Sequence, residues 1–426
     1  MPTTPPDLQA PITQRPSDRH RRSTALLPRT AAFAVAATAF FLVFAAAGTP
    51  IPMYRVFAAD DGLTDSDFAL ASVGYFAAAV GSLLLLGRIS DHVGRRAAGV
   101  AALVVVGAGT AMIPFIHGPA PLVIARVLQG VAAGIAPSAL GAYAIDTAPR
   151  RLPWLSAVIA ASTPMLGIPV GAVFSGLIVD HTGSPRIILT TTIVIALTVT
   201  TFLLILGPET VRRSPGLIRS LAPRLHVPHG AGRLLFTTGA AACATWSLGG
   251  FFQAFGPSVT AEYLGTDGAF IAALVFGSVM ILNPVGGPIA ARMSTKAGVR
   301  TGMTVFVIAL SALIVSLATG SIGTFLTAAL VIGVAQGIAS TAAMRALVAG
   351  LTPADRAGAL AAVYLVSYAG SAIPVFIAGQ LAHVVPLLGI AVGYGVLGTA
   401  AAVAAAATVR DPRESSALVA SALRVS

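Results

Sequence analysis

Twelve long apolar segments, separated by short polar ones, constrain the fold of this chain more than any other feature. They cover residues 31–49, 68–86, 97–116, 122–145, 155–179, 187–206, 234–255, 269–291, 301–318, 325–348, 358–381 and 387–409. Most are close to the ~20 residues that a helix needs to cross about 30 Å of hydrocarbon. Because unpaired backbone groups cannot face lipid, we expect each segment to be a transmembrane helix. The chain is therefore predicted to be an all-α integral membrane protein.

The composition indicates a chain embedded in lipid and argues against a catalytic centre or a metal site. Hydrophobic residues make up 56% of the 426 positions and charged residues only 10%, which is too little polar surface for a soluble globule of this size. The single cysteine, Cys243, excludes an internal disulfide and a thiolate metal cage. A membrane enzyme would need clusters of His, Asp, Glu or Cys inside the spans, and the segments contain none. We expect no enzyme activity, no cofactor and no metal site.

Positive charge is concentrated in alternate loops and predicts the orientation of the chain. If the N-terminus is cytoplasmic, all basic residues except Arg55, Arg126 and Arg186 lie on the cytoplasmic side, which is 23 of the 26. This is the bias that membrane proteins show. We predict a multi-pass protein of the cell membrane with both termini cytoplasmic. The net charge of +11 then reflects topology and contact with lipid headgroups rather than binding of nucleic acid.

The spacing of the apolar segments divides the chain into two groups of six. The predicted organisation is a disordered cytoplasmic tail (1–30), a six-helix bundle (31–207), a central cytoplasmic loop (208–232), a second six-helix bundle (233–409) and a cytoplasmic tail (410–426). Alternatively, the first span is a cleaved signal peptide ending near Ala45 to Ala47. Cleavage would leave eleven spans and destroy the six-plus-six division, so we favour an uncleaved first helix.

The two groups of six also resemble each other in sequence. Gln129 and Gln336 lie in matching Gln-Gly dipeptides 207 residues apart. At an offset of 204, the residues Arg292, Gly298 and Arg300 repeat Arg88, Gly94 and Arg96, whereas Thr295 stands where Asp91 would be repeated. Parallel repeats of this kind occur in transporters that hold substrate between two halves near mid-membrane.

A dense ionic block between the second and third apolar segments carries the most specific motif. It includes Gly87, Arg88, Asp91, Gly94, Arg95 and Arg96. The block resembles the loop between helices 2 and 3 of the major facilitator superfamily (MFS) of secondary transporters. The resemblance implies the MFS fold, with twelve transmembrane helices in two pseudo-symmetric six-helix bundles, and a small-molecule substrate.

By the same resemblance, the ionic block forms a conformational lock on the cytoplasmic side. Asp91 would face the start of helix 11, at Thr352 to Arg356, and Asp146 would be a third member of the cluster. Asp91 and Arg95 are four residues apart, so a helical turn would place them on one face. The alternative is a solvated loop that only sets topology, which would explain the arginines but not the two spaced glycines and the single acid.

Arg126 lies inside the predicted span 122–145, and intramembrane charge normally faces a cavity or a partner. Its surroundings resemble the helix 4 motif of the same superfamily, where this Arg is tied to proton coupling in several antiporters. The alternative is that Arg126 snorkels to the nearby outer surface. The polar residues expected to line a cavity, or alternatively to bond helices together, are Gln129, Trp246, Gln253, Asn283, Gln336, Tyr364, Ser367, Tyr368 and Ser371.

The resemblance is closest to drug and metabolite efflux members, and it implies proton-linked export of drug-like or metabolic compounds by alternating access. The helix 5 segment, Thr163 to Ala172, has the glycines and prolines of the antiporter pattern but not in register. No acid lies in the middle of the spans, which argues against a cation-binding pocket, and an uncompensated Arg126 would favour a neutral or anionic substrate. Uptake of a sugar or organic acid is the alternative, and a membrane scaffold or sensor is the non-transport alternative. We expect a monomer.

Overall fold

The computed structural model describes residues 26–149, 151, 153–211, 214–221, 232–349, 351 and 353–410, and its regular elements in these ranges are all helical. Twelve of the described helical segments are long and apolar enough to cross a membrane, which confirms the predicted fold class. Most of both predicted tails, residues 222–231 of the central loop and Arg150 lie outside the described residues.

Each half of the chain contributes six spans. The first half contains α1 (Arg29–Gly48), α2 (Pro50–Asp61), α3 (Asp65–Leu86), α4 (Ile89–Val93), α5 (Arg95–Ala111), a 3-10 turn η1 (Ile113–Phe115), α6 (Pro119–Ala136), a π-type turn η2 (Pro137–Gly141), α7 (Ala142–Thr147), α8 (Pro153–His181) and α9 (Pro185–Ile205). A short helix, α10 (Leu217–Ser220), lies in the central loop. The second half contains α11 (Gly232–Tyr263), α12 (Ala269–Ile281), α13 (Asn283–Ala291), α14 (Thr295–Thr319), α15 (Ile322–Ala349), α16 (Pro353–Leu381) and α17 (Leu387–Thr408).

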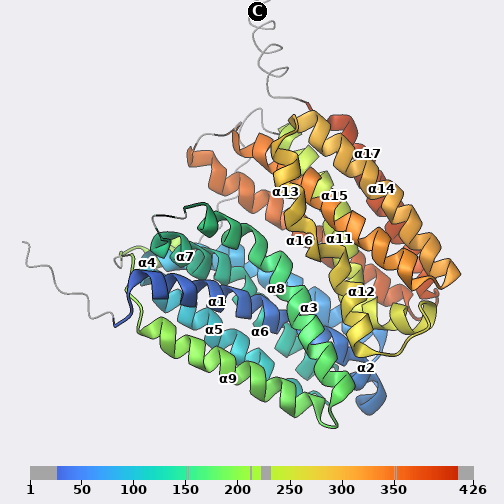
Figure 1. The fold of residues 1–426 in the computed structure, drawn as a ribbon, viewed down its shortest axis with the longest axis horizontal. Helices are drawn as coiled ribbons and strands as arrows, with labels where there is room; N and C mark the ends of the chain where they lie inside the picture. Colours follow the sequence, from blue (N-terminus) through green and yellow to red (C-terminus); the bar gives the residue numbers. More distant parts are fainter. Residues whose placement is uncertain are drawn as a thin grey trace, which may run out of the picture.

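The two halves form separate bundles that meet along a few helices (Figure 1). Helix α8 packs against α12, and α3 packs against α16. We name the two ends of the molecule by residues found there. The Gly87 end contains α4 and the start of α1, and the Arg186 end contains the end of α2 and the start of α9. Large apolar side chains such as Val104, Phe115 and Ile195 are exposed on the outer surface, as lipid contact requires.

Three predicted boundaries were wrong, and each helix is longer than hydropathy indicated. The first span continues through α2 to Asp61, the seventh continues to Tyr263, and the ninth begins at Thr295. The added turns carry polar residues such as Arg55 and Glu262, so their transfer into lipid is unfavourable and a hydropathy pattern omits them. The turns added to the first and seventh spans form because their helices continue into contact with the other half, where α2 packs on α11 and α12. The turn added to the ninth span is capped by Ser294, whose Oγ accepts the Ala297 N–H, and α14 packs on α15 and α17 of its own half.

Glycine lets helices of one bundle approach closely. A Cβ atom added to Gly134 of α6 would lie 1.9 Å from Ser82 Oγ, and one added to Gly171 of α8 would lie 1.9 Å from the Ala45 carbonyl oxygen. Gly130 and Gly167 have the same role, because a Cβ at either position would meet a neighbouring helix at 2.7 Å or less.

Candidate functional site

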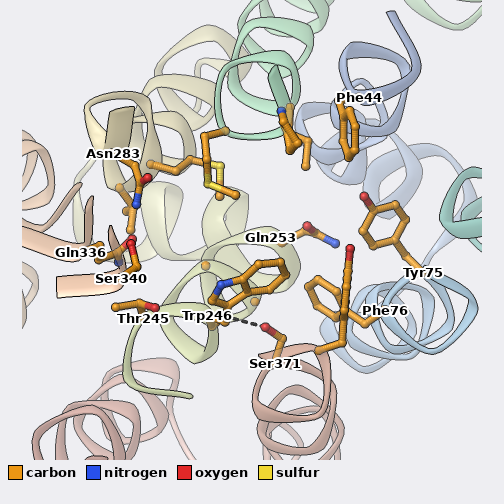
Figure 2. Close-up of a pocket in the computed structure, with 18 of the residues that line it drawn as sticks. Phe44, Tyr75, Phe76, Thr245, Trp246, Gln253, Asn283, Gln336, Ser340 and Ser371 are labelled. Carbon is orange, nitrogen blue, oxygen red and sulfur yellow. Dashed lines mark hydrogen bonds between the residues drawn. The ribbon is translucent and has the colours of Figure 1, made fainter. Parts of the chain in front are cut away.

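A cavity of about 220 Å³ lies between the two halves (Figure 2). The first half supplies Phe44, Tyr75, Phe76, Ala161, Pro164, Met165 and Ile168 to its wall. The second half supplies Thr245, Trp246, Gly249, Gly250, Gln253, Val279, Met280, Asn283, Gln336, Ser340, Tyr368 and Ser371. Gln336 and Gln253 come from the middle of long helices, so the cavity lies midway between the two ends of the molecule.

Some of the residues expected in a cavity line it and others do not. Asn283, Gln336 and Tyr368 lie in the wall, together with Trp246, Gln253 and Ser371. Tyr364 lies one turn from Tyr368 toward the Gly87 end, is 40% exposed and is not part of the wall. Gln129 and Arg126 are fully buried behind the first-half wall. Ser367 is also buried, and its hydroxyl donates to the Val363 carbonyl of its own helix.

Arg126 is held by α1 rather than by an acid. Its Nη1 donates to the Ala47 carbonyl at 2.5 Å and to Gln129 Oε1 at 2.8 Å, and Gln129 Nε2 donates to the Ala46 carbonyl at 3.2 Å. The carbonyl of Ala46 lacks its regular helical partner because Pro50, four residues on, has no N–H. Arg126 and Gln129 therefore stabilise the break between α1 and α2. The snorkelling alternative is wrong for this structure, because the Arg126 side chain is completely buried.

The Arg126 guanidinium also connects to the cavity through an aromatic ring. Its Cζ lies 4.5 Å from the centre of the Tyr75 ring, and Tyr75 lines the cavity. Two further donors of Arg126, Nε and Nη2, are buried without a hydrogen-bond partner among the described residues. In the described part of the chain this cation has no carboxylate partner, so its charge is balanced only by carbonyl dipoles and the ring face.

Three of the predicted lock residues meet at the Gly87 end. Arg95 Nη1 lies 2.7 Å from Asp91 Oδ1, and Arg95 Nε lies 3.5 Å from Asp146 Oδ2. The helix does not continue between Asp91 and Arg95 as expected. It stops at Gly94, whose φ of +103° favours glycine, and α5 begins at the next residue. The contact forms because the Arg95 side chain turns back over this break, where it also donates to the Ser138 carbonyl of η2.

Glu209, which the sequence did not single out, is central to the same cluster. Its carboxylate accepts hydrogen bonds from the backbone N–H groups of Arg95 at 2.9 Å and Arg96 at 3.2 Å. A carboxylate at this position stabilises the positive end of α5. A Cβ added to Gly94 would lie 2.4 Å from Glu209 Oε2, so glycine is also needed to admit the acid. No local pattern around Glu209 indicates this role, because its partners lie more than 100 residues earlier in the chain.

The remaining residues of the block have structural partners as well. Gly87 ends α3, and Arg88 follows it with partners of its own. Arg96 Nη1 donates to the Ile205 and Gly207 carbonyls, at the end of α9. In the second half, Arg300 Nε donates to the Ala406 carbonyl at the end of α17. Arg96 and Arg300, which match in the sequence repeat, therefore each cap the end of the last helix of their bundle.

The predicted partner of Asp91 in the second half is not tested by the described contacts. Thr352 and the side chains of Pro353 and Ala354 lie outside the described residues. The described ion pairs of Asp91 and Arg95 are with first-half residues. At the Arg186 end, Asp60 and Asp61 do not reach the cavity. Both carboxylates pair with Arg186, and Asp61 also contacts His117.

Hydrogen bonds and ion pairs between the halves gather at the Arg186 end. Asp180, at the end of α8, accepts the backbone N–H groups of Ala269 at 2.8 Å and Phe270 at 2.9 Å, which are the first two residues of α12. Arg55 of α2 pairs with Asp267 at 2.7 Å. A side chain of the first half thus caps a helix of the second half.

Helices α3, α11 and α16 add further contacts at the same end. Ser258 Oγ of α11 donates to Asp65 Oδ1 of α3 at 2.5 Å. Ser66 Oγ donates to the Gly379 carbonyl of α16 at 2.5 Å and lies 2.8 Å from His383 Nε2. The cavity is therefore closed off from the Arg186 end by paired polar groups as well as by packed helices.

Comparison with known proteins agrees with this architecture. A sequence model described as Major Facilitator Superfamily matches residues 36–344. The crystal structure of a D-xylose-proton symporter superimposes with a TM-score of 0.67 at 18% identity, covering 90% of this chain and 97% of that one. A mutant of the nucleoside transporter NupG superimposes with a TM-score of 0.70 at 12% identity, covering 89% and 100%. No curated protein matches the chain in sequence.

Proposed function

The chain belongs to the Major Facilitator Superfamily of transporters, and from this premise we propose that it moves a small organic solute by alternating access. In this mechanism the central cavity faces one side of the membrane at a time. The observation that carries the proposal is the cavity between the halves, bounded by both bundles and closed toward the Arg186 end by cross-half contacts such as Asp180 with the start of α12.

Export of a drug-like or metabolic compound, coupled to protons, is the direction we propose. With the termini in the cytoplasm of a cell-membrane protein, the Gly87 end is cytoplasmic, so the closed Arg186 end faces outward. The apolar first-half wall of Phe44, Phe76 and Met165 suits the apolar part of a small organic solute taken up from the cell interior. The ion pairs among Asp91, Arg95 and Asp146 lie within the first half, where they would hold the ionic block in position for an inner lock with the start of α16.

Uptake of a polar solute is the second candidate, and the opposite wall of the cavity favours it. Gln253, Asn283 and Gln336 offer several hydrogen-bonding groups of the type that bind hydroxylated molecules. The two structural neighbours are a D-xylose-proton symporter and a nucleoside transporter. A sugar-like or nucleoside-like solute would place its oxygens against this wall.

Flux in proteoliposomes under an imposed pH gradient of either sign distinguishes export from uptake. Reconstituted protein would be screened against labelled uncharged and anionic solutes, with protein-free liposomes as the control. Export in exchange for protons requires accumulation of the solute on the acidic side, whereas proton symport requires accumulation on the alkaline side. Absence of protein-dependent flux for every solute under both gradients would contradict transport by this chain.

A further inference from the structure

The amide side chains in the wall of the cavity all come from the second half. The first half contributes apolar side chains, including Phe44, Phe76 and Ile168, and the Tyr75 hydroxyl. The second half contributes the amides of Gln253, Asn283 and Gln336 and several hydroxyl groups, beside the apolar residues Trp246, Val279 and Met280. In Figure 2 the Gln253 amide lies in the middle of the cavity, between Trp246 on one side and Tyr75 on the other. A molecule that fits both walls has one apolar side and one polar edge.

Two hydrogen-bond donors on the polar wall lack partners. Gln253 is 4% exposed and Gln336 is 6% exposed, and the Nε2 atom of each is buried without a partner among the described residues. A buried donor left unpaired costs free energy, so such groups are rare unless a ligand or water completes them. Because both amides line the cavity, an occupant of the cavity can supply the two missing acceptors.

The internal repeat shows why one of these amides is free. In the first half, Gln129 accepts from Arg126 and donates to the Ala46 carbonyl, so both ends of its amide are satisfied. At an offset of 207 residues, Gly333 stands in the position of Arg126. Gln336, the counterpart of Gln129, therefore has no such cation beside it and presents its amide to the cavity instead.

The charge around the cavity disfavours ionic occupants. None of the residues in the wall is an acid or a base. The nearest buried charge is Arg126, which lies behind the Tyr75 ring and has no carboxylate partner in the described part of the chain. A cation in the cavity would meet this positive charge in a low-dielectric region with no acid to offset it. An anion would find no cationic side chain in the wall to replace its hydration.

Resting on the proposed function, we infer that the cargo is an uncharged solute with an apolar side and an oxygen-bearing edge. Gln253 and Gln336 donate hydrogen bonds from their amides to two acceptor oxygens of that edge, and the aromatic residues of the first half cover the apolar side. The volume of about 220 Å³ lies below the roughly 300 Å³ at which pockets for drug-sized ligands begin. The solute is therefore smaller than most multidrug substrates.

A binding experiment can use the tryptophan in the wall as its reporter. The chain has two tryptophans, so the Trp154→Phe variant leaves Trp246 of the cavity as the sole tryptophan, which can be excited selectively. The probes share one skeleton: 1-phenylethane-1,2-diol is uncharged with two oxygens, 1-phenylethanol has one oxygen, mandelate is the anion and 2-amino-1-phenylethanol is the cation at pH 7. Binding is measured by fluorescence titration of the full chain in nanodiscs.

The expected order is tightest binding for the diol, weaker binding for the mono-alcohol and weakest binding for the two ions. Replacing Gln253 or Gln336 by methionine keeps the length of the side chain but removes the donor. Each change should weaken diol binding by about three- to tenfold, the effect of one hydrogen bond, and should leave binding of 1-phenylethanol less affected. Gln380→Met, an exposed glutamine outside the cavity, is the matched control and should change neither.

Three results would overturn the inference: no binding of the diol, binding of the cation or the anion as tight as that of the diol, or methionine variants that keep the parent's preference for the diol. These results concern the cargo only. If the probes do not bind in the expected order but another class of solute is transported in proteoliposomes, the inferred substrate class is wrong and the proposed transport function still holds. Loss of all flux would instead refute the transport function.

Discussion

The contact of Asp180 with the start of α12 predicts a measurable shift in the balance between conformations. The Asp180 carboxylate of the first half accepts two backbone N–H groups of the second half, at 2.8 and 2.9 Å. Both bonds must break when the halves separate at the Arg186 end. Replacing a capping acid by alanine costs about 0.5–2 kcal/mol in helices generally. The Asp180→Ala variant should therefore destabilise the closed state by about 1–2 kcal/mol, which corresponds to a five- to thirtyfold rise in the ratio of open to closed molecules.

Distances between spin labels on the two halves report this ratio. Gly183 and Gly323 lie at the Arg186 end of the first and second halves, and an added Cβ meets nothing within 4 Å at either position. Cysteines placed there, with Cys243 replaced by alanine, carry the labels. The long-distance population should grow in Asp180→Ala. The control is Asp267→Ala, which removes an ion pair whose acid is 82% exposed and should change the balance by no more than about 1 kcal/mol.

If Asp180→Ala leaves the distance distribution of the parent unchanged, the Asp180 cap does not stabilise the closed state. If Asp267→Ala shifts the distribution as strongly, an exposed ion pair contributes as much as the cap between the halves, and the cap has no special role.

Three further predictions concern the first half. Asp91→Asn removes the ion pair with Arg95 and should greatly reduce flux per folded molecule while leaving membrane insertion and the melting temperature near the parent values; undiminished flux would contradict the lock. Glu209→Gln weakens the cap on α5 by about 0.3–1 kcal/mol, so amide exchange at the start of α5 should quicken, and unchanged exchange would argue against the cap. Gly134→Ala places a Cβ 1.9 Å from Ser82 Oγ and should cost about 1–3 kcal/mol in thermal unfolding, whereas Gly81→Ala, which meets nothing within 4 Å, should cost much less.

The twelve helices and their division into two halves could be predicted from sequence, because lipid requires every span to be apolar and to satisfy its own backbone hydrogen bonds. The ends of the first and seventh spans could not, since the turns that carry Arg55 and Glu262 are held by the opposite half and not by lipid. The repeat pairs Gln336 with Gln129, but only Gln336 lines the cavity. Gln129 does not, because its amide is occupied by Arg126 and the Ala46 carbonyl.

The two acids that cap helices from distant parts of the chain could not be identified from the sequence. Glu209 and Asp180 look like ordinary loop or helix-end acids, because their partners are backbone N–H groups of residues about 90 to 114 positions away. Every residue except proline has a backbone N–H group, so the sequence of the partner segment contains no motif that indicates such a contact. Asp91 and Asp146, in contrast, pair with the Arg95 side chain. Their association could be anticipated from the ionic motif.

Counterflow exchange tests most directly whether the central cavity carries an uncharged solute across the membrane. Proteoliposomes are loaded with unlabelled xylose, uridine or 1-phenylethane-1,2-diol, and entry of the labelled compound is followed without any ion gradient. Ala161→Trp fills the cavity from α8, whereas Val104→Trp places the same side chain on the lipid-facing surface of α5, where Val104 is 58% exposed. We expect protein-dependent counterflow of at least one of these solutes, abolished by Ala161→Trp and retained by Val104→Trp. Counterflow that survives Ala161→Trp, or its absence for every uncharged solute, would contradict this expectation.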